Sequence, residues 1–439
     1  MSTPDTPLEH VTPYDRFAWR DTEVEQHLAS GAHAGELIAY FGATEYRQLR
    51  ALARRAAAAG IDPRTPRVVL VPGIMGSQLG LPRASPLPND VVWIDPLDIH
   101  LGRLAALRLP SPGPVVPLGV VLFSYLRLRL NLRAHGFRVD CHDYDWRLPV
   151  TELGAALARR LQSLAPARVA LVAHSMGGLV ARAALADAGV AGVERVVLLG
   201  TPNRGSFAAV QALRGTYAVV RKVARLDATG TAQSLTAEVF SSFPSLYDML
   251  PRDGELDLYD PASWPAAEPR PRAALLAAAR ATLAALAPAD ERFTAIVGIG
   301  QETVTRARRR GTQFIYTLTR HGDGTVPAAS AELAGAGSLY ARVAHSDLTR
   351  DATVAAAVVE LLRRGRTRRL PPRHLGASRA CAQIGDAQLA RTHARKADWA
   401  ALTPEERRVF LENLNEPPRL RLRIPVRRRR AGHSPRRHR

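Results

Sequence analysis

Three stretches of the chain are almost entirely apolar and rich in β-branched residues. They read RVVLVPGIMGS from residue 67, RVALVAHSMGG at 168–178 and VERVVLLGTPN at 193–203. None has the alternation of apolar and polar residues that is typical of a strand with one face in water. Continuous apolar runs of this length instead predict strands that are covered on both faces, as in a parallel sheet.

The segments between these runs have helical periodicity. Leu153, Leu157, Leu161 and Leu164 follow one another at the spacing of one helix face just before the second run. Strand character returns in RFTAIVGIG at 292–300 and in TQFIYTLTRHGDGTVP, which follows a predicted basic turn, RARRRG. DATVAAAVVELLRRG at 351–365 is typical of an amphipathic helix. The alternation predicts an α/β fold with a mainly parallel central sheet.

The chain divides by character into three regions. Residues 1–65 predict a short helical preface and linker, with apolar residues at helical spacing. Residues 66–362 contain the α/β pattern, interrupted at 204–290 by a long insertion that we interpret as a cap or lid. Residues 363–439 form a basic extension that we expect to be partly disordered. Within the extension, a short helix is predicted from Thr403 to about Asn413, an alternating strand over 419–424, and a solvated end over the last 13 residues.

The net charge of +20 is concentrated in this extension. Residues 363–439 hold 22 Lys and Arg against 6 Asp and Glu, whereas residues 1–362 hold 38 against 34. The α/β region is therefore nearly neutral, which argues against a nucleic-acid enzyme. The arginine-rich tail has three interpretations: contact with an anionic membrane surface, contact with nucleic acid, and a solvated end that keeps the protein in solution.

Other compositional features exclude further classes. Two cysteines, Cys141 and Cys381, cannot form a disulfide framework. We find no apolar run long enough to span a membrane and no signal-peptide pattern at the N-terminus, so we expect a cytoplasmic protein, with peripheral membrane contact left open.

The second apolar run ends in Ala173-His174-Ser175-Met176-Gly177-Gly178. A serine between a strand and a helix, with small residues two before and two after it, is the pattern of a nucleophile elbow. Ala173 stands where the first glycine is usual. The N–H of Met176, with one from the turn VPGIMGS at 71–77, could bind an acyl oxyanion. An ordinary strand–turn–helix junction and an ordinary Pro-Gly turn are the alternatives.

Two later residues complete a catalytic pattern. Asp323 lies between glycines in HGDGTVP, and His345 precedes the last predicted helix. Alone, these would be a generic turn and a surface histidine. The order Ser175, Asp323, His345 is that of an α/β-hydrolase triad, in which the histidine takes the serine proton and the carboxylate orients the imidazole.

In this order, the motifs VPGIMGSQL, YDWR, AHSMGG, LLGTPNRGS and GDGTVP and the late histidine resemble the lecithin:cholesterol acyltransferase family of α/β-hydrolases, over about residues 66–362. The resemblance implies an acyl-enzyme mechanism on lipid esters, with Ser175, Asp323 and His345 as the triad. It also implies an oxyanion hole formed by the N–H groups of Ile74, Met75 and Met176. Trp93 and Ile94 lie where a lid or acyl-site segment with membrane contact is expected. The preface and the tail lie outside the resemblance, and the chain lacks the secretion signal and disulfides of the animal enzymes.

The remaining candidates receive structural interpretations. We expect Asp145, Trp146 and Arg147 to support the site, His174 to face away from it in a packing role, and Cys141 to be a buried strand residue. His142 and Asp143 have no second ligand cluster nearby, so we predict no metal, and no cofactor is expected. Asp347 is an alternative acid near His345, less well placed than Asp323.

The sequence therefore predicts a serine-dependent acyl hydrolase or O-acyltransferase of lipid esters. A soluble carboxylesterase or thioesterase and a catalytically silent binding protein of the same fold are the alternatives. Whether water or an alcohol accepts the acyl group, the lipid head group and acyl preference, and the oligomeric state all stay open.

Overall fold

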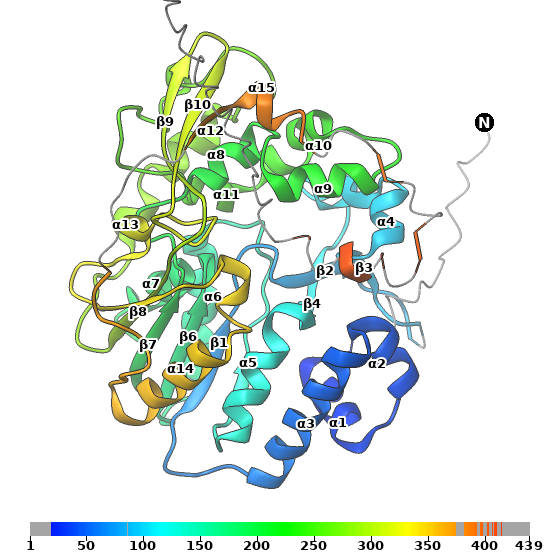
Figure 1. Cartoon of the computed structure of the whole chain (residues 1–439), viewed down its shortest axis with the longest axis vertical. Coiled ribbons are helices and arrows are strands. Elements are labelled where there is room, and N and C mark those ends of the chain that lie inside the picture. The colour runs from blue at the N-terminus through cyan, green and yellow to red at the C-terminus, as the bar shows by residue number, and fades with distance from the viewer. Residues whose placement is uncertain are drawn as a thin grey trace, which may run out of the picture.

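The computed structural model describes residues 19–374 except residue 86, and of the later chain residues 382–392, 396–397, 402–403, 406, 408–410 and 414. The predicted strand at 419–424 and the solvated C-terminal end lie outside the described residues. Every element below is taken from the described part of the chain (Figure 1).

A six-stranded parallel sheet forms the centre of the molecule. All neighbouring strands pair in parallel, and the three apolar runs of the sequence are adjacent in it. The order across the sheet is β11 (Gly337–Ala341), β8 (Phe293–Gly298), β7 (Val193–Leu199), β6 (Val169–His174), β1 (Arg67–Val71) and β5 (Val139–Cys141).

Helices cover both faces of this sheet (Figure 1). Successive side chains of a strand point to opposite faces, so each strand contributes to two separate cores. Val68 and Leu70 of β1 pack with α5 (Leu122–Ala134) and α14 (Ala352–Arg364), whereas Val69 and Val71 pack with α6 (Val150–Ser163) and α7 (Met176–Leu185). The predicted α/β fold with a mainly parallel, doubly covered sheet is confirmed.

The N-terminal segment adds a further helical layer. It consists of α1 (Asp21–Ser30), α2 (Ala34–Phe41) and α3 (Ala43–Ala59), with the break between α2 and α3 at Gly42. Their apolar faces pack on Leu122, Leu126 and Leu130 of α5. The apolar contacts of the layer are therefore made mainly with one face of α5.

The segment 204–290, for which the sequence predicts an inserted cap, is largely helical. Figure 1 places its green helices above the upper end of the central sheet. They are α8 (Phe207–Leu213), α9 (Ala218–Leu226), α10 (Ala232–Glu238), η3 (Phe240–Ser242), α11 (Pro244–Asp248), η4 (Pro261–Ser263), α12 (Ala273–Ala279) and η5 (Thr282–Ala285).

The basic segment RARRRG is not a turn. Most of it belongs to β9 (Thr303–Arg310), which pairs with β10 (Gln313–Thr319) in an antiparallel hairpin outside the central sheet. Ala307 is buried between exposed arginines at 306 and 308, so the arginines occupy the solvent face of a strand. The turn is at Gly311, with a positive φ of 58°.

Within the C-terminal extension, residues 382–397 contain the contacts to the hairpin and to the cap segment 204–290. β12 (Ala382–Gly385) joins the hairpin beside β10, and α15 (Asp386–Leu389) follows it. Farther on, Lys396 donates through Nζ to the carbonyl oxygens of Ala224, Asp227 and Gly230 at the end of α9. Thr403 and Glu406 make the predicted capping box, in which Glu406 N–H donates to Thr403 Oγ1 at 3.2 Å. Residues 406 and 408–410 are helical, as predicted, and 411–413 lie outside the described residues.

Residues 77–120 contain a second small antiparallel sheet. The order of its strands is β3 (Asp90–Trp93), β2 (Ser77–Leu81) and β4 (Val116–Val120). Between β3 and β4 the chain forms α4 (Pro96–His100) and η2 (Arg103–Leu107). No helix in the described part of the chain combines the length and apolar character that a bilayer-crossing segment needs.

Candidate active site

Ser175 occupies a sharp turn between β6 and α7. Its backbone has φ 55° and ψ −130°, a region that residues other than glycine rarely adopt. Close packing behind the turn requires glycine: a Cβ at Gly177 would lie 2.3 Å from the carbonyl oxygen of Pro72, and one at Gly178 would lie 2.0 Å from Thr201 Oγ1. Ala173 is fully buried, so the methyl group in place of the usual glycine is accommodated.

The structure brings Ser175, His345 and Asp323 together. His345 Nε2 lies 2.9 Å from Ser175 Oγ, and His345 Nδ1 lies 2.7 Å from Asp323 Oδ2. Asp323 is fully buried, and the serine and histidine expose only 6% and 8% of their surface. With Nδ1–H donating to the carboxylate, Nε2 is left as the acceptor for the serine hydroxyl.

The Asp323 carboxylate is fixed by its own loop. Oδ1 accepts hydrogen bonds from the N–H groups of Thr325 at 2.9 Å and Val326 at 2.7 Å, which leaves Oδ2 for the imidazole. The Asp323 carbonyl oxygen also accepts from the N–H of His345 at 2.9 Å. Asp347, the alternative acid, instead lies 3.9 Å from Arg350.

The turn at residues 73–76 faces the serine. A Cβ at Gly73 would lie 2.7 Å from the Cβ of Ser175, so the two turns are in close contact. Met75 has a positive φ of 60°. Among the hydrogen bonds of the described residues, none uses the N–H of Ile74, Met75 or Met176. The N–H of Gly73 is not free in this way, because it donates to Tyr125 Oη at 2.8 Å.

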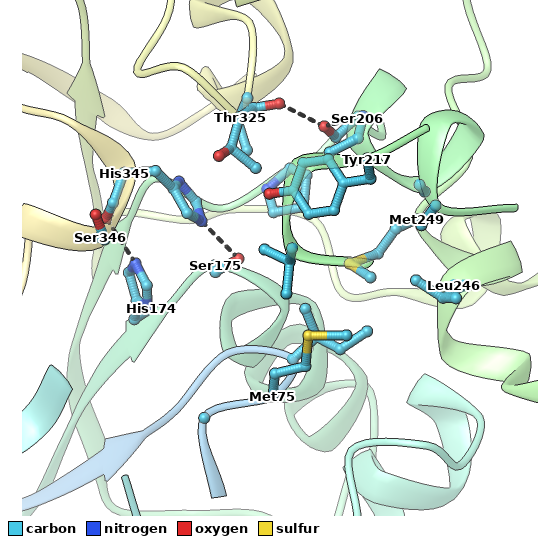
Figure 2. Close-up of a pocket in the computed structure, with 18 of the residues that line it drawn as sticks. Met75, His174, Ser175, Ser206, Tyr217, Leu246, Met249, Thr325, His345 and Ser346 are labelled. Atoms are coloured by element: carbon cyan, nitrogen blue, oxygen red, sulfur yellow. Dashed lines mark hydrogen bonds between the residues drawn. The ribbon is translucent and has the colours of Figure 1, made fainter. Parts of the chain in front are cut away.

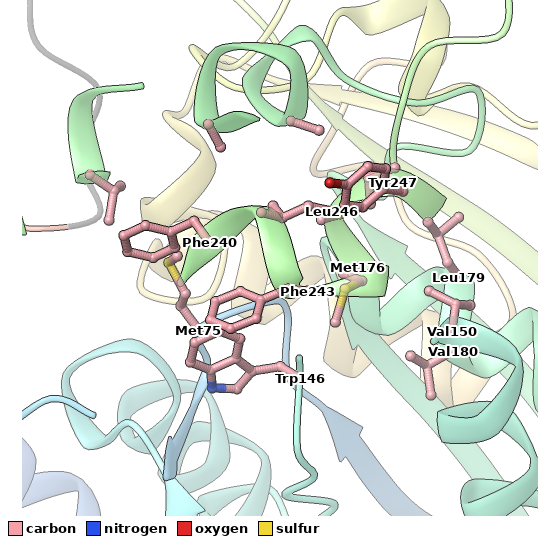
Figure 3. Packing of buried hydrophobic residues seen from close by; sticks show 14 of the residues in the cluster. Met75, Trp146, Val150, Met176, Leu179, Val180, Phe240, Phe243, Leu246 and Tyr247 are labelled. Carbon is pink, nitrogen blue, oxygen red and sulfur yellow. The ribbon is translucent and has the colours of Figure 1, made fainter. Parts of the chain in front are cut away.

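The YDWR motif supports this turn. Tyr144 Oη donates to the carbonyl oxygen of Pro72, and Trp146 Nε1 donates to that of Ser77 at 3.0 Å. Trp146 is also stacked edge-to-face with Phe243 of the cap, with ring centroids 5.6 Å apart (Figure 3). The motif therefore holds both ends of the 72–77 turn and joins it to the cap, in agreement with a supporting role.

His174 does more than pack. Its Nδ1 lies 2.9 Å from Tyr125 Oη and its Nε2 lies 3.1 Å from the carbonyl oxygen of His345. Since Tyr125 Oη already accepts from Gly73 N–H, the hydroxyl donates to His174 Nδ1, and Nε2–H donates to His345. Burial, with a contribution from nearby His345, lowers the pKa of His174 to about 3, so it is neutral in this chain of hydrogen bonds.

A cavity opens beside Ser175. Its volume for water-sized molecules is about 90 Å³, and it is partly open to solvent. Figure 2 shows side chains from the 73–76 turn, the triad loops and the cap facing this space. Its apolar wall is formed by Ile74, Met75, Pro202, Ala208, Ala209, Ala212, Val219, Leu246, Met249 and Val326.

Trp93 and Ile94, expected to form a lid or acyl site, do not line this cavity. The Trp93 side chain is fully buried, and its Nε1–H donates to the carbonyl oxygen of Met75 at 3.1 Å. The Trp93 ring packs edge-to-face against Trp146, with centroids 5.4 Å apart, and so belongs to the core that supports the 73–76 turn. Ile94 is 6% exposed and belongs to the same core.

The described residues contain no group of three or more His, Cys, Asp or Glu side chains arranged to hold a metal ion. His142 Nδ1 lies 3.1 Å from the guanidinium Nη1 of Arg160. This nitrogen therefore faces a cation, which disfavours the binding of a metal ion there. Burial, assisted by Arg160, lowers the pKa of His142 to about 4.

Comparison with known proteins gives a partial match. A model of the family described as PGAP1-like alpha/beta domain matches residues 155–243, which include the Ser175 turn. Comparison with curated proteins finds no match.

Several solved structures are similar in part. The mature Bacillus licheniformis lipase BlEst2 is 16% identical, with 69% of this chain and 94% of the lipase covered and a TM-score of 0.37. A chain of the Tle4–Tli4 complex is 16% identical, with coverage of 68% and 98% and a TM-score of 0.47. EstA from Clostridium botulinum is 10% identical, with coverage of 69% and 87% and a TM-score of 0.31. Likenesses this distant carry no information on substrate, and the resemblance to the lecithin:cholesterol acyltransferase family stays a prediction.

Proposed function

We propose that the protein is a serine-dependent hydrolase of esters with an apolar acyl group, acting through an acyl-enzyme intermediate. The observation that carries this proposal is the connected set Ser175 Oγ, His345 Nε2 and Asp323 Oδ2, with separations of 2.9 and 2.7 Å, at the edge of an apolar cavity. A serine hydroxyl needs an adjacent base to become a nucleophile, and this arrangement supplies one.

In the proposed reaction, Ser175 Oγ attacks the ester carbonyl carbon while its proton passes to His345 Nε2. Asp323 stabilises the imidazolium that results. The oxyanion is bound by the N–H of Met176 and by those of Ile74 and Met75, which have no other partner among the described hydrogen bonds. When the C–O bond breaks, the proton moves from His345 to the departing alcohol oxygen. Water then loses a proton to His345 and attacks the acyl-enzyme carbonyl carbon; as the bond to Ser175 Oγ breaks, His345 returns this proton to Oγ, and the acid leaves.

The cavity wall supports a lipid-type acyl chain. Ten of the residues that line the cavity are aliphatic or methionine, and several of these come from the cap. Burial of each methylene of an acyl chain in such a wall is worth about 0.8 kcal/mol. We therefore expect long-chain esters to be favoured over acetyl esters, which separates this function from that of a small-ester carboxylesterase or a thioesterase with a polar substrate.

Exposed leucines support contact with a lipid surface. Leu97 and Leu101 expose 37% and 55% of their surface on the segment that follows Trp93 and Ile94. Apolar side chains that project from the same short segment are suited to insertion among acyl chains. In this proposal the contact with lipid is made by these leucines rather than by the buried Trp93 and Ile94.

The test is covalent labelling combined with turnover. The wild-type protein should react with a fluorophosphonate probe and hydrolyse p-nitrophenyl esters, with higher kcat/KM for octanoate than for acetate. Ser175→Ala should lose labelling and at least about 10³-fold of turnover while retaining its circular dichroism spectrum. Ser163→Ala, at an exposed serine of α6, is the matched control and should behave as wild type.

Two results would contradict the proposal. Undiminished ester cleavage by Ser175→Ala would mean that another nucleophile acts. A folded wild-type protein that neither labels nor cleaves any ester would favour a silent binding protein. Mass spectrometry of products from phospholipid vesicles that contain a long-chain alcohol separates the two acyl acceptors: free fatty acid indicates a hydrolase, and a new ester indicates an O-acyltransferase.

A further inference from the structure

The cavity beside Ser175 also has polar atoms that the proposed reaction does not use. Thr325 Oγ1 and Ser346 Oγ both belong to half-buried residues that line it, both oxygen atoms are buried, and neither makes a hydrogen bond of good geometry with another described residue. Buried hydroxyls in folded proteins are nearly always paired. Two unpaired hydroxyls in the wall of one cavity therefore point to a ligand that pairs with them.

Tyr217 adds a third hydroxyl from the cap. It directly precedes α9, and Figure 2 shows its ring reaching into the cavity, with the hydroxyl on the side of Thr325 and the triad. The hydroxyl lies near the Thr325 side chain, although Thr325 Oγ1 still lacks a hydrogen bond of good geometry. Burial raises the pKa of Tyr217, so its hydroxyl remains a neutral donor throughout the neutral range.

Thr325 holds a fixed position relative to the triad. Its N–H donates to Asp323 Oδ1 at 2.9 Å, and its carbonyl oxygen accepts from Ser206 Oγ at 2.6 Å (Figure 2). Ser206 is the N-cap of α8, the first cap helix. The Thr325 hydroxyl is therefore positioned by both the triad loop and the cap, and a group bound to it is positioned relative to Ser175.

We propose that Tyr217 and Thr325 form a subsite for the alcohol half of the ester, and that this subsite binds a free hydroxyl group on that alcohol. The inference rests on the proposed function. A hydroxyl of the substrate can accept from Tyr217 and pair with Thr325 Oγ1, which is otherwise left without a partner. The acyl chain then occupies the aliphatic wall that includes Ala212, Leu246 and Met249.

The chemical class of substrate that fits is an ester of a polyol, with glycerol as the simplest example. An ester of a plain alkyl alcohol would desolvate the Thr325 and Tyr217 hydroxyls without replacing their hydrogen bonds. Sites built to hydrogen-bond a substrate hydroxyl discriminate strongly against analogues that lack it. We expect a preference of about tenfold or more in kcat/KM for the polyol ester.

The experiment compares 1-monooctanoylglycerol with methyl octanoate, which share the acyl chain. Wild type should prefer the glycerol ester by about tenfold or more. Tyr217→Phe and Thr325→Val should each reduce this ratio of kcat/KM values toward one, and Thr325→Ser, which keeps the hydroxyl, should retain most of it. Tyr259→Phe is the matched control: Tyr259 is a buried cap tyrosine whose hydroxyl donates to Leu250 O at 3.0 Å outside the cavity, so the ratio should not change.

Equal wild-type rates on the two esters would overturn the inference, as would a Tyr217→Phe variant that slows both esters by the same factor. The second result would mean that Tyr217 only supports the cap. Both leave the proposed function intact, provided that fluorophosphonate still labels Ser175. A wild-type protein that cleaves neither ester and does not label would overturn the function and, with it, the subsite.

Discussion

His174 Nε2 lies 3.1 Å from the carbonyl oxygen of His345, and the two rings are tilted by 39° with centroids 4.8 Å apart. The residue before the proposed nucleophile, Ser175, thus holds the backbone of the proposed base, His345. Through Tyr125 the same chain of hydrogen bonds reaches the N–H of Gly73. The turn opposite the serine and the histidine loop are therefore connected by side chains that do not themselves react.

Replacement of His174 should weaken catalysis without removing any triad member. His174→Phe keeps a buried ring but loses both hydrogen bonds, and we expect kcat to fall about tenfold, or about 1.4 kcal/mol in activation free energy. We expect a smaller effect on KM, because the lost hydrogen bonds go to the His345 loop and to Tyr125, although His174 also lines the cavity. Steady-state kinetics with p-nitrophenyl octanoate and the rate of fluorophosphonate labelling measure the effect.

Tyr125→Phe gives the control for this prediction. If His174 and Tyr125 act through the same series of hydrogen bonds, the variant that carries both His174→Phe and Tyr125→Phe should be about as slow as the slower single variant. Additive losses would show that they act separately.

The glycines behind the serine turn should not tolerate a side chain. In Gly177→Ala the new Cβ would meet backbone oxygens of Val71 and Pro72 at 2.5 and 2.3 Å, and backbone cannot move aside as a flexible side chain can. We expect a loss of about 3 kcal/mol or more in the free energy of unfolding, or failure to fold. Urea unfolding followed by circular dichroism measures it.

Gly35→Ala is the matched control. Gly35 lies in the first turn of α2, and apart from its chain neighbours and the backbone of its own helix no atom lies within 4 Å of the position of a Cβ, so alanine there should be neutral or stabilise by up to about 1 kcal/mol. A Gly177→Ala protein as stable as wild type would contradict the close packing of the two turns.

Stability should fall in mild acid, in part through His142. Its pKa is lowered from 6.5 to about 4 by burial and Arg160, so below pH 6.5 the unfolded chain takes up a proton that the folded protein does not. The contribution is complete above pH 6.5 and is lost as the pH falls to about 4, with a total of about 3 kcal/mol. In His142→Gln, the decrease in melting temperature from pH 7 to pH 5 should be smaller than in wild type. The same decrease in both proteins would show that His142 titrates normally.

The sequence predicted the parts of the fold and site that depend on local patterns. β-branched apolar runs identified the parallel strands, and the small residues around Ser175 identified its turn. The order of three separated motifs predicted the grouping of Ser175, Asp323 and His345 that the structure contains. Each of these signals reflects a local steric or burial requirement that a few neighbouring residues satisfy.

What the sequence did not predict depends on contacts between distant segments. The hydrogen bonds of His174 join it to α5 and to a loop 171 residues away, and Tyr217 reaches the cavity from an insertion without any motif. Trp93 resembles a lid residue in sequence, yet Trp146 and the Met75 carbonyl hold it in the core. The sequence of β9 ends in four arginines with Ala307 as the one buried residue among them. A single buried position is too short an alternation to indicate a strand, so this segment was predicted to be a turn.

Lys396, one of two lysines in the chain, should stabilise the cap. Its ammonium group satisfies carbonyl oxygens at the C-terminal end of α9, where a cation is also favoured by the helix dipole. Lys396→Met keeps the aliphatic stem but loses these bonds, and we expect a loss of about 1 kcal/mol in stability and faster hydrogen exchange over residues 218–226. Arg391→Met, at an exposed position of the same segment, is the control and should leave the exchange of α9 unchanged.

The helical layer α1–α3 has a consequence for handling the protein. Among the described residues, Leu122, Leu126 and Leu130 form an apolar stripe on α5 that packs with this layer, while other side chains of α5 face the sheet. A shortened protein that begins at the first strand would present this stripe to water as a hydrophobic patch. Such a protein would keep every residue proposed for the reaction and would still be lost to aggregation.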